Sequence, residues 1–414
     1  MAGALPERPL AVAPAYRWFD SLRDRNFRLL LGSNLLIYLS NMMEMVVLGW
    51  LILDITDSIW KVTVGAFLRF GPVLPMSLLV GTLADRFDRR KLLLFNLAGD
   101  MATVGVMAIL VSLGSIELWQ IYAIAPLRGV FNAVEQPLRR TVAMDMVGQQ
   151  RITNALSLDA SLMMAASIVG PFVSGRLIDT LGSKGSYITI FVLYGLGMIL
   201  LSILRTPRRT SRLSSDSIIK NIVEGLRYTL THPVILPTLA ITFIMNLLGF
   251  PFRQVFPVFA RDIYGVSATG LGLLSSLIGI GAFLGSMVLA SLGSRFMKSR
   301  IYIWGSVLMA GAIIFFSLSG HYYLSLLILF FHGFGFAGFH IMQGAIPLSA
   351  AAEDKRGRVM GATQLAIGGG PIGTLLVGGL ASALGPQMAV GIMASVLTLS
   401  ILAIALSAST LKKY

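Results

Sequence analysis

Cysteine is absent from this chain of 414 residues, and charged residues are scarce. Without cysteine there can be no disulfide and no thiolate ligand for a metal. Asp, Glu, Lys and Arg make up 13% of the sequence, whereas an average soluble domain carries about 25%. Hydrophobic residues make up 55%. A soluble protein of this size cannot hide so much apolar surface, so the composition predicts an integral membrane protein.

The sequence also lacks the GxxxxGK[ST] loop with which ATP-hydrolysing domains hold phosphate. We therefore expect no cofactor, no metal and no enzyme activity. An excess of basic residues gives a net charge of +14, which would suit nucleic acid if the charge formed one surface. Its placement along the chain, described below, indicates another cause, and we expect no nucleic-acid partner.

Apolar runs recur along the chain at the length that a membrane helix needs, about 20 residues. They predict an all-α membrane protein of twelve transmembrane helices, near 28–53, 61–82, 92–113, 118–140, 153–178, 186–204, 234–260, 268–291, 301–319, 322–346, 358–383 and 387–409. The predicted domains are an N-terminal tail with an interfacial segment (1–27), a six-helix bundle (28–205), a cytoplasmic linker with an amphipathic helix (206–232) and a second six-helix bundle (233–414).

Basic residues gather in alternate loops of this predicted topology. The N-terminal tail, the connections that follow helices 2, 4, 6, 8 and 10, and the C-terminus hold most of them, whereas the other loops hold only Lys61, Lys184 and Arg261. Arg139, Arg140 and Asp145 are placed at the connection after helix 4. Positive loops stay on the side from which the chain inserts, so both termini are expected in the cytoplasm and the protein in the cell inner membrane.

The two halves echo each other in sequence. "ASLGSRFMKSR" (290–300) occupies the same relative place as "GTLADRFDRRK" (81–91), and "IGGGPIG" (367–373) is a weaker counterpart of "SIVGPFVSG" (167–175). Two six-helix halves related as parallel repeats are typical of transporters that bind substrate between the halves.

These motifs resemble the major facilitator superfamily. "GTLADRFDRRKLL" is similar to its loop 2–3 signature, and "PLRGVFNAVEQP" to its helix 4 signature, in which Arg128 stands as the buried arginine. "SIVGPFVSG" is similar to the helix 5 signature of antiporters, although Ser174 stands where glycine is usual. The overall pattern resembles the branch that holds macrolide-efflux proteins and the enterobactin exporter.

The resemblance implies a set of gating residues. In that family the loop 2–3 aspartate and arginines bridge the two halves on the cytoplasmic side when the transporter faces outward. Glycine and proline in predicted helices 5 and 11 are expected to add flexibility and close backbone contact, because glycine lacks a side chain and proline removes a helix hydrogen bond; the alternative is ordinary tight packing. A bland alternative is that the charges of loop 2–3 only hold it at the membrane surface. The residues assigned to gating are Asp85, Arg86, Arg90, Asp145, Gly170 and Pro171.

Polar residues form stripes on the first and fourth helices of each half, because positions three, four and seven apart share one face of a helix. In the fold that the chain resembles, these helices line the central cavity. The alternative is a set of structural ion pairs. The residues predicted to bind substrate are Asn34, Tyr38, Asn41, Glu44, Arg69, Arg128, Asn132, Asn246, Arg253, His332, Phe336, His340 and Gln343. Asp100 and Asp159 are expected near cytoplasmic helix starts, without a role in transport.

The sequence thus predicts a proton-coupled exporter of an amphipathic drug or siderophore-like molecule, working by rocking of its halves. Glu135 with Arg128 is the predicted proton-coupling pair, and Glu44 is the second choice. Two alternatives stay open: a transporter of lysophospholipid or other lipid, and an importer or facilitator of the same fold. The expected partners are the substrate, protons and membrane lipids, and the expected state is a monomer.

Overall fold

The computed structural model describes residues 20–73, 75–76, 88–204, 218–292 and 296–412. These residues are almost all helical, with no β-strand among them. Nine of their helical stretches are long and apolar enough to cross a membrane. Asp85 and Arg86, predicted to act in gating, lie outside the described residues.

Among the described residues up to 204, one short turn is followed by four long or medium helices. These elements are η1 (Asp20–Arg23), α1 (Arg25–Thr56), α2 (Ile59–Phe70), α4 (Arg89–Ser112) and α5 (Leu118–Ile203). The Asp24 carboxylate begins α1 by accepting hydrogen bonds from the amides of Asn26 and Phe27, at 2.7 and 3.2 Å. An aspartate at this position satisfies amides that have no partner inside the helix.

The second part begins with α6 (Ile218–Thr231), at the place of the predicted amphipathic helix. An irregular helical segment follows, made of α7 (Ile235–Ile244), η2 (Met245–Gly249), η3 (Phe250–Val255), α8 (Phe256–Val258) and η4 (Phe259–Ile263). The remaining elements are α9 (Ala268–Leu292), α10 (Lys298–Leu318), α11 (Tyr322–Ala350), η5 (Glu353–Lys355), α12 (Arg356–Ile367), α13 (Gly370–Leu384), α14 (Pro386–Ser407) and α15 (Ser409–Lys412).

Two glycines divide the 86-residue α5 into three helical segments. Gly148 and Gly182 have φ angles of 73° and 69°, which residues with a β-carbon rarely adopt. Predicted helices 4, 5 and 6 are therefore successive segments of α5. The first segment continues past residue 140, so Arg139 lies inside a helix and is buried. Its predicted place in a loop was wrong.

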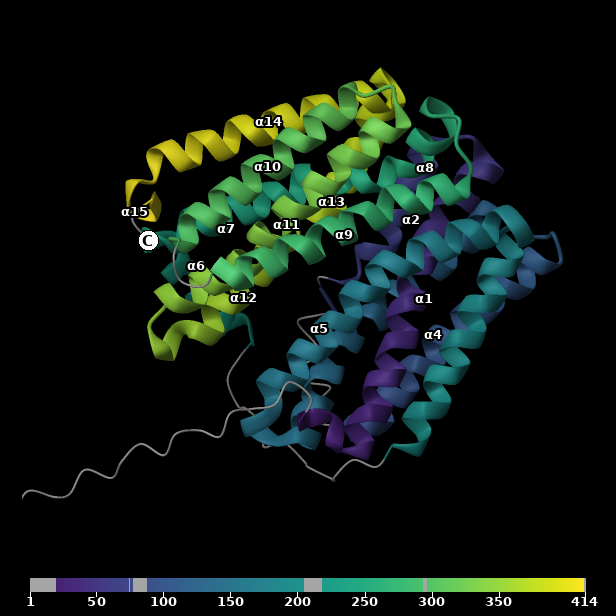
Figure 1. Cartoon of the computed structure of the whole chain (residues 1–414), viewed down its shortest axis with the longest axis horizontal. Coiled ribbons are helices and arrows are strands. Elements are labelled where there is room, and N and C mark those ends of the chain that lie inside the picture. Colours follow the sequence, from purple (N-terminus) through teal and green to yellow (C-terminus); the bar gives the residue numbers. More distant parts are fainter. Residues whose placement is uncertain (1–19, 74, 77–87, 205–217, 293–295, 413–414) are drawn as a thin grey trace, which may run out of the picture.

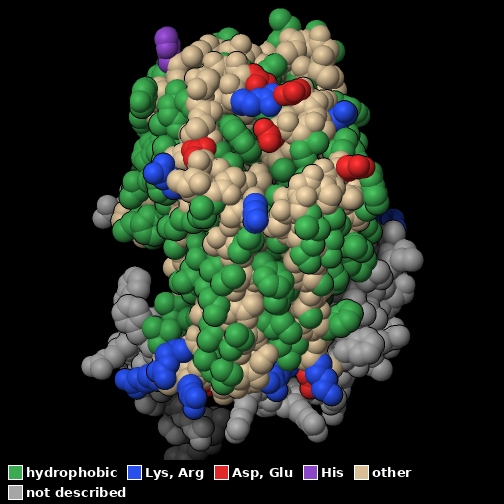
Figure 2. All heavy atoms as spheres, turned by 90° about the vertical axis from the view of Figure 1, so that its right-hand side faces the viewer, with side chains coloured by type: hydrophobic (Ala, Val, Ile, Leu, Met, Phe, Trp, Pro, Cys, Tyr) green, Lys and Arg blue, Asp and Glu red, His purple; other side chains and the backbone are tan. Residues whose placement is uncertain are grey.

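The outer surface of the helices suits lipid. Figure 2 shows one face on which hydrophobic side chains dominate the middle, with mixed charges towards the top and Lys and Arg at the bottom edge. Large apolar side chains such as Phe95 and Trp304 are 71% exposed. In water such a surface would aggregate, whereas in a membrane it contacts acyl chains.

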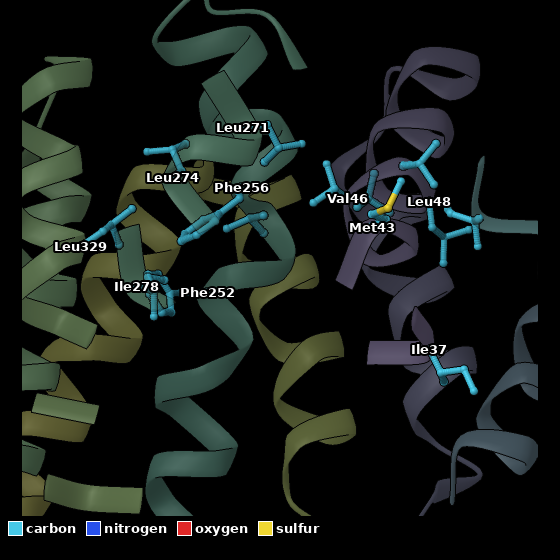
Figure 3. Close-up of a cluster of buried hydrophobic side chains, with 14 of the residues drawn as sticks. Ile37, Met43, Val46, Leu48, Phe252, Phe256, Leu271, Leu274, Ile278 and Leu329 are labelled. Carbon is cyan, nitrogen blue, oxygen red and sulfur yellow. The ribbon is translucent and has the colours of Figure 1, made fainter. Parts of the chain in front are cut away.

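The helices form two groups that pack against each other (Figure 1). Helices α1, α4 and α5 lie on one side, and α7, α10, α11 and α14 on the other. At the contact, Val46 of α1 lies opposite Leu271 of α9, close to Phe256 (Figure 3). The two groups also meet where α5 packs against α9 and where α2 packs against α13.

Glycines let the backbones of the two groups approach closely. A β-carbon on Gly175 of α5 would lie 2.2 Å from the Ala268 carbonyl oxygen, and one on Gly272 of α9 would lie 2.4 Å from the Pro171 carbonyl oxygen. Gly170 likewise faces Met42 of α1, with 2.8 Å between its missing β-carbon and that of Met42. Small residues at such contacts are how membrane helices gain packing energy.

Polar contacts join the same two groups at one end, which we call the closed end. The Asp179 carboxylate of α5 accepts hydrogen bonds from the amides of Ala268 and Thr269, at 3.0 and 2.9 Å, and so caps α9. Arg261 of η4 pairs with Asp57, the residue after α1, at 2.8 Å. Asp179, which belongs to the group of α1, α4 and α5, therefore caps a helix of the other group.

Replacing Asp179 with alanine should lower the free energy of unfolding by about 1 kcal/mol, the usual cost of removing a helix cap. The matched control is Asp54→Ala, since Asp54 is exposed at the same end of α1. Chemical unfolding of the purified variants in detergent measures both values. Equal stability of the two variants would contradict the role of Asp179 as a cap.

Candidate functional site

Arg128 of α5 lies at the centre of a buried ionic cluster. Its Nε donates to both oxygens of Glu44 in α1, at 3.1 Å each, and the guanidinium also pairs with Asp100 of α4. Arg69 of α2 pairs with the same Glu44 carboxylate at 2.7 Å. We call Glu44, Arg69, Asp100 and Arg128 the Arg128 cluster; all four side chains are buried.

A second polar cluster lies next to the first. Arg139 donates to Glu135 at 2.8 Å and to Asn34, whose amide nitrogen donates to Asp159 at 2.6 Å. Asp159 also accepts a hydrogen bond from the hydroxyl of Tyr38 at 2.9 Å. We call Asn34, Tyr38, Glu135, Arg139 and Asp159 the Glu135 cluster.

Asn41 of α1 links the two clusters. Its side-chain oxygen accepts from Arg128 at 3.3 Å and from Tyr194 at 3.0 Å, and its nitrogen donates to Glu135 at 3.5 Å. Tyr194 in turn accepts a hydrogen bond from Arg128 at 3.0 Å. One continuous set of ion pairs and hydrogen bonds therefore runs from Arg69 to Asp159 through α2, α1 and α5, and Asp100 of α4 joins it at Arg128.

The two clusters differ in charge. The Arg128 cluster has two arginines and two carboxylates, so its formal charges cancel. The Glu135 cluster has one arginine and two carboxylates, so it carries a formal charge of −1 when both carboxylates are ionised. Arg139 also has a buried nitrogen, Nη2, without a hydrogen-bond partner among the described residues. Arg69 Nη1 in the Arg128 cluster also lacks a hydrogen-bond partner among the described residues, although it lies 2.7 Å from Glu44. The unbalanced formal charge is therefore what distinguishes the Glu135 cluster.

The second group of helices contributes an irregular segment to the site. Between residues 245 and 263 the chain passes from π to 3₁₀ to α and back to π geometry. Pro251 and Pro257 explain the interruptions, because proline lacks an amide hydrogen and its ring clashes with the preceding turn. Interrupted helices at membrane depth are tolerated where they line a cavity or are buried in protein. Asn246, Arg253 and Gln254 all lie on this segment.

A large and a small cavity lie between the two groups. The large one has a volume of about 620 Å³ and the small one about 70 Å³. Residues that line the large cavity from both groups include Phe70, Asn132, Gln136, Asn246, Phe250 and Gln254. Phe70 and Gln254 also line the small cavity, together with Arg69, Pro171 and Arg253. The two cavities are therefore neighbours.

The histidines of α11 lie in other surroundings. His332 is buried, with its ring centroid 5.0 Å from that of Phe252, and its Nδ1 lies 3.4 Å from the Met309 carbonyl oxygen. His340 stacks on Phe336 at 5.0 Å and lies 3.0 Å from Gln343. None of these α11 residues is among those that line the two cavities.

Two sequence-based expectations require correction. Arg128 was expected to pair with Glu135, but it pairs with Glu44 and Asp100, while Glu135 pairs with Arg139. Asp100 was expected near a cytoplasmic helix start without a further role, but it lies in the twelfth position of α4 and is buried against Arg128.

Asp159 was treated in the same way as Asp100, but it is half-buried and accepts hydrogen bonds from Asn34 and Tyr38. Neither of these two carboxylates belongs to one of the predicted stripes of polar residues, so the stripe pattern did not identify them. Asp100 is the only acidic residue of α4, and the nearest acidic residues to Asp159 in the sequence are Asp145 and Asp179. The usable signal was a lone acidic residue well inside an apolar run, since such a residue needs a partner from another helix.

Near the connection between α2 and α4, the described arginines contact the first group of helices. Arg89 pairs with Asp145 at 2.7 Å, and Arg90 donates to the Ser202 carbonyl at 2.5 Å. Asp145, assigned to gating, therefore pairs with Arg89, which was not among the residues assigned to gating.

The fold and the cavity between two groups of helices are those of a multi-pass membrane transporter. The chain superposes on a POT family transporter in complex with a thioalcohol-conjugated peptide with a TM-score of 0.78, at 11% identity, over 94% of this chain and 96% of that one. A bacterial homologue of the human lysosomal transporter Spinster gives 0.73 at 13% identity, over 94% and 98%. At these identities the likeness concerns the fold alone.

The family described as "Transmembrane secretion effector" matches residues 17–413. The chain therefore belongs to this family, which is of the major facilitator type.

Curated relatives of the chain are transporters. The multidrug efflux pump Tap of Mycolicibacterium fortuitum is 26% identical over 83% of this chain and 86% of its own length. The enterobactin exporter EntS of Escherichia coli O1:K1 / APEC is 24% identical over 84% and 85%. The staphyloferrin A transporter of Staphylococcus aureus (strain NCTC 8325 / PS 47) is 22% identical over 68% and 71%.

Replacing Glu44 with glutamine should lower the free energy of unfolding by about 3–5 kcal/mol, because it leaves two buried arginines with one carboxylate between them. Glu353→Gln is the control, since that side chain is 89% exposed and its ion pair should contribute at most about 1 kcal/mol. Unfolding in detergent measures both. A Glu44→Gln variant as stable as the control would show that the cluster does not hold the helices together.

Proposed function

We propose that this protein is a secondary active exporter of the cell inner membrane, which moves an amphipathic drug or siderophore-like molecule outwards in exchange for protons. The observation that carries the proposal is the cavity of about 620 Å³ lined from both groups of helices, beside buried ionisable clusters in one of them. Tap and EntS, which match most of the chain, are described as an efflux pump and an exporter.

The proposed architecture is the twelve-helix arrangement with both termini in the cytoplasm. The three segments of α5, the segment from α7 to η4, and the pair α12 and α13 each fit the predicted spans. Residues 28–205 and 233–414 would be the two bundles, joined by a linker over 206–232. Rocking of one bundle against the other would expose the cavity alternately to the two sides.

Rocking requires contacts that can separate. Two such contacts lie at the closed end: Asp179 of α5 caps α9, and Asp57 forms an ion pair with Arg261. Both contacts are partly exposed to solvent. Gly170 and Pro171 lie beside the close contact of α5 with α1 and α9 and would be the pivot. At the other end, Arg90 and Asp145 now contact the first bundle, and with Asp85 and Arg86 we propose that they bridge the bundles when the cavity faces outwards.

The Glu135 cluster is the proposed proton carrier. The cluster has a formal charge of −1, so binding one proton makes it neutral. A neutral cluster costs less free energy to bury than a charged one. The spare Nη2 of Arg139 can engage a second carboxylate when Glu135 is protonated. Asn41 connects this change to Arg128 and Glu44 in the other cluster. Glu135 thus keeps its proposed role with Arg139 as its direct partner, while Arg128 acts through Asn41.

The proposed substrate site is the large cavity. Asn132, Gln136 and Asn246 offer amide groups, and Phe250 offers an aromatic surface, as expected of a site for an amphipathic molecule. Phe336 lies behind Phe250, with 5.8 Å between ring centroids, and would support it. None of His332, His340 and Gln343 lines the large cavity. The buried His332 and Gln343 would act behind its wall, whereas the side chain of His340 is exposed.

Proteoliposomes with an acidic lumen test the exchange. In an antiporter, protons leaving the lumen drive uptake of the substrate, and a difference of one pH unit supports about tenfold accumulation of a neutral solute for one proton. We expect labelled enterobactin or staphyloferrin A to accumulate under this gradient. Glu135→Gln and Asp159→Asn should abolish the gradient-driven accumulation, while Glu353→Gln should retain it.

Three results would contradict the proposal. Accumulation driven by an alkaline lumen would identify a symporter, and flux indifferent to pH with both variants active would remove proton coupling. Translocation of labelled lysophosphatidylcholine without transport of either siderophore would support the lipid-transporter alternative.

A further inference from the structure

Arg253 is an arginine at the centre of the structure without a counter-charge. Arg69, Arg89, Arg128, Arg139 and Arg261 each pair with a carboxylate within 4 Å. Arg253 has no ion pair and no hydrogen bond with any residue in the described part of the chain. It lies on η3, the 3₁₀ turn between two π turns, with Phe252 and Val255 buried on either side. A guanidinium held there unpaired costs free energy, so a functional partner is the expected reason for it.

Arg253 and Arg69 lie on opposite sides of the contact between the two groups of helices. Both arginines line the small cavity, Arg69 from α2 and Arg253 from η3. Arg69 and Arg128 share the carboxylate of Glu44. That carboxylate is therefore already paired and does not serve as a counter-ion for Arg253. Two guanidinium groups around one cavity attract an anion, and guanidinium groups bind oxyanions through paired, charge-assisted hydrogen bonds.

The size and surroundings of the small cavity limit what can bind. Its volume of about 70 Å³ lies well below the roughly 300–1,000 Å³ of pockets for drug-sized ligands, so it has room for a carboxylate or similar oxyanion but not for a whole drug-sized molecule. It adjoins the large cavity at Phe70 and Gln254, where apolar side chains such as Phe250 and Ile367 are available. One molecule with an anionic end and an apolar body would fill both.

We infer that the protein binds amphipathic anions, with a carboxylate or other oxyanion held between Arg253 and Arg69 and the apolar body in the large cavity. The inference rests on the proposed function and names the charge of its substrate. In this arrangement the two groups of helices contribute different residues to one binding site. The first group supplies the paired arginine, and the second supplies the unpaired cation.

Matched probes that differ only in charge test this inference. The probes are 4-(2-naphthyl)butanoate and 4-(2-naphthyl)butan-1-ol, and binding to purified protein is measured by thermal stabilisation against ligand concentration. We expect wild-type protein to bind the anion at least tenfold more tightly than the alcohol. Arg253→Gln should lose this preference by weakening only the anion, and Arg253→Lys should retain part of it. The control is Arg227→Gln, since Arg227 is exposed on α6.

The stability of the variants without ligand separates binding from a structural role. Arg253→Gln removes an unpaired charge, so it should unfold at the same temperature as the wild type or higher. A lower temperature would show that Arg253 has a structural partner and would overturn the inference. So would equal binding of the anion and the alcohol by the wild type, or an anion preference that survives Arg253→Gln.

Failure of this inference and failure of the proposed function give different results. Siderophore uptake driven by an acidic lumen, in a protein that does not prefer the anionic probe, leaves the exporter and removes the anion site. An anion preference that depends on Arg253, without gradient-driven uptake, leaves the site and removes the proton-coupled exporter.

Discussion

The pairing of Arg128 with Glu44 and Asp100 is the constraint on which the rest of the first group of helices depends. A charge inside a membrane is costly, at about 2.5–3.5 kcal/mol on insertion scales, so each of these residues requires the others. Their four helices, α1, α2, α4 and α5, approach one another at the depth where the charges meet. Apolar packing in lipid lacks this directionality, because acyl chains are as apolar as leucine. The cluster therefore specifies which helices are neighbours and at what height.

The irregular segment from Met245 to Ile263 has the corresponding role in the second group. Pro251 and Pro257 prevent a regular helix, and the resulting π and 3₁₀ turns change which side chains face the first group. Arg253 and Gln254 consequently reach the small cavity from one turn of backbone, while Asn246 reaches the large cavity. A regular helix would direct these residues along one narrow stripe. The interruption allows a charged, an amide and an aromatic group to border neighbouring spaces.

Much of the architecture could be predicted from the sequence, because membrane helices are recognisable from length and hydropathy alone. The polar stripe of α1 was also informative: Asn34, Tyr38, Asn41 and Glu44 all take part in the buried clusters. The partners of these residues could not be predicted. Which carboxylate meets Arg128 depends on helix rotation and depth, and a periodic pattern on one helix contains neither.

The predictions that were wrong have the same cause, because a pattern on one helix gives neither its depth nor its neighbours. Arg139 was placed in a loop because basic residues mark membrane boundaries, but the helix continues and Glu135, one turn earlier, neutralises it. The stripe of α11 contains His332, His340 and Gln343, yet His332 packs against Phe252 and His340 stacks on Phe336 of the same helix, and none of the three lines the two cavities. Helical spacing predicts that residues share a face. Which element covers that face is decided by close approaches such as Gly305 with Gly335, whose missing β-carbon would lie 2.8 Å from the Gly305 carbonyl oxygen.

The two halves of the chain share a repeated sequence pattern but differ in how their charges are balanced. In the first half, every buried arginine that the structure describes has a carboxylate, and the carboxylates exceed the arginines by one across the two clusters. In the second half, Arg253 has none among the described residues. The excess negative charge belongs to the Glu135 cluster, none of whose residues lines either cavity, whereas Arg253 lines the small cavity. Repetition of the fold would provide the frame for the proposed alternating access, and the divergence of the charged residues within it would provide the two proposed binding roles, a proton in the first half and an anion at Arg253.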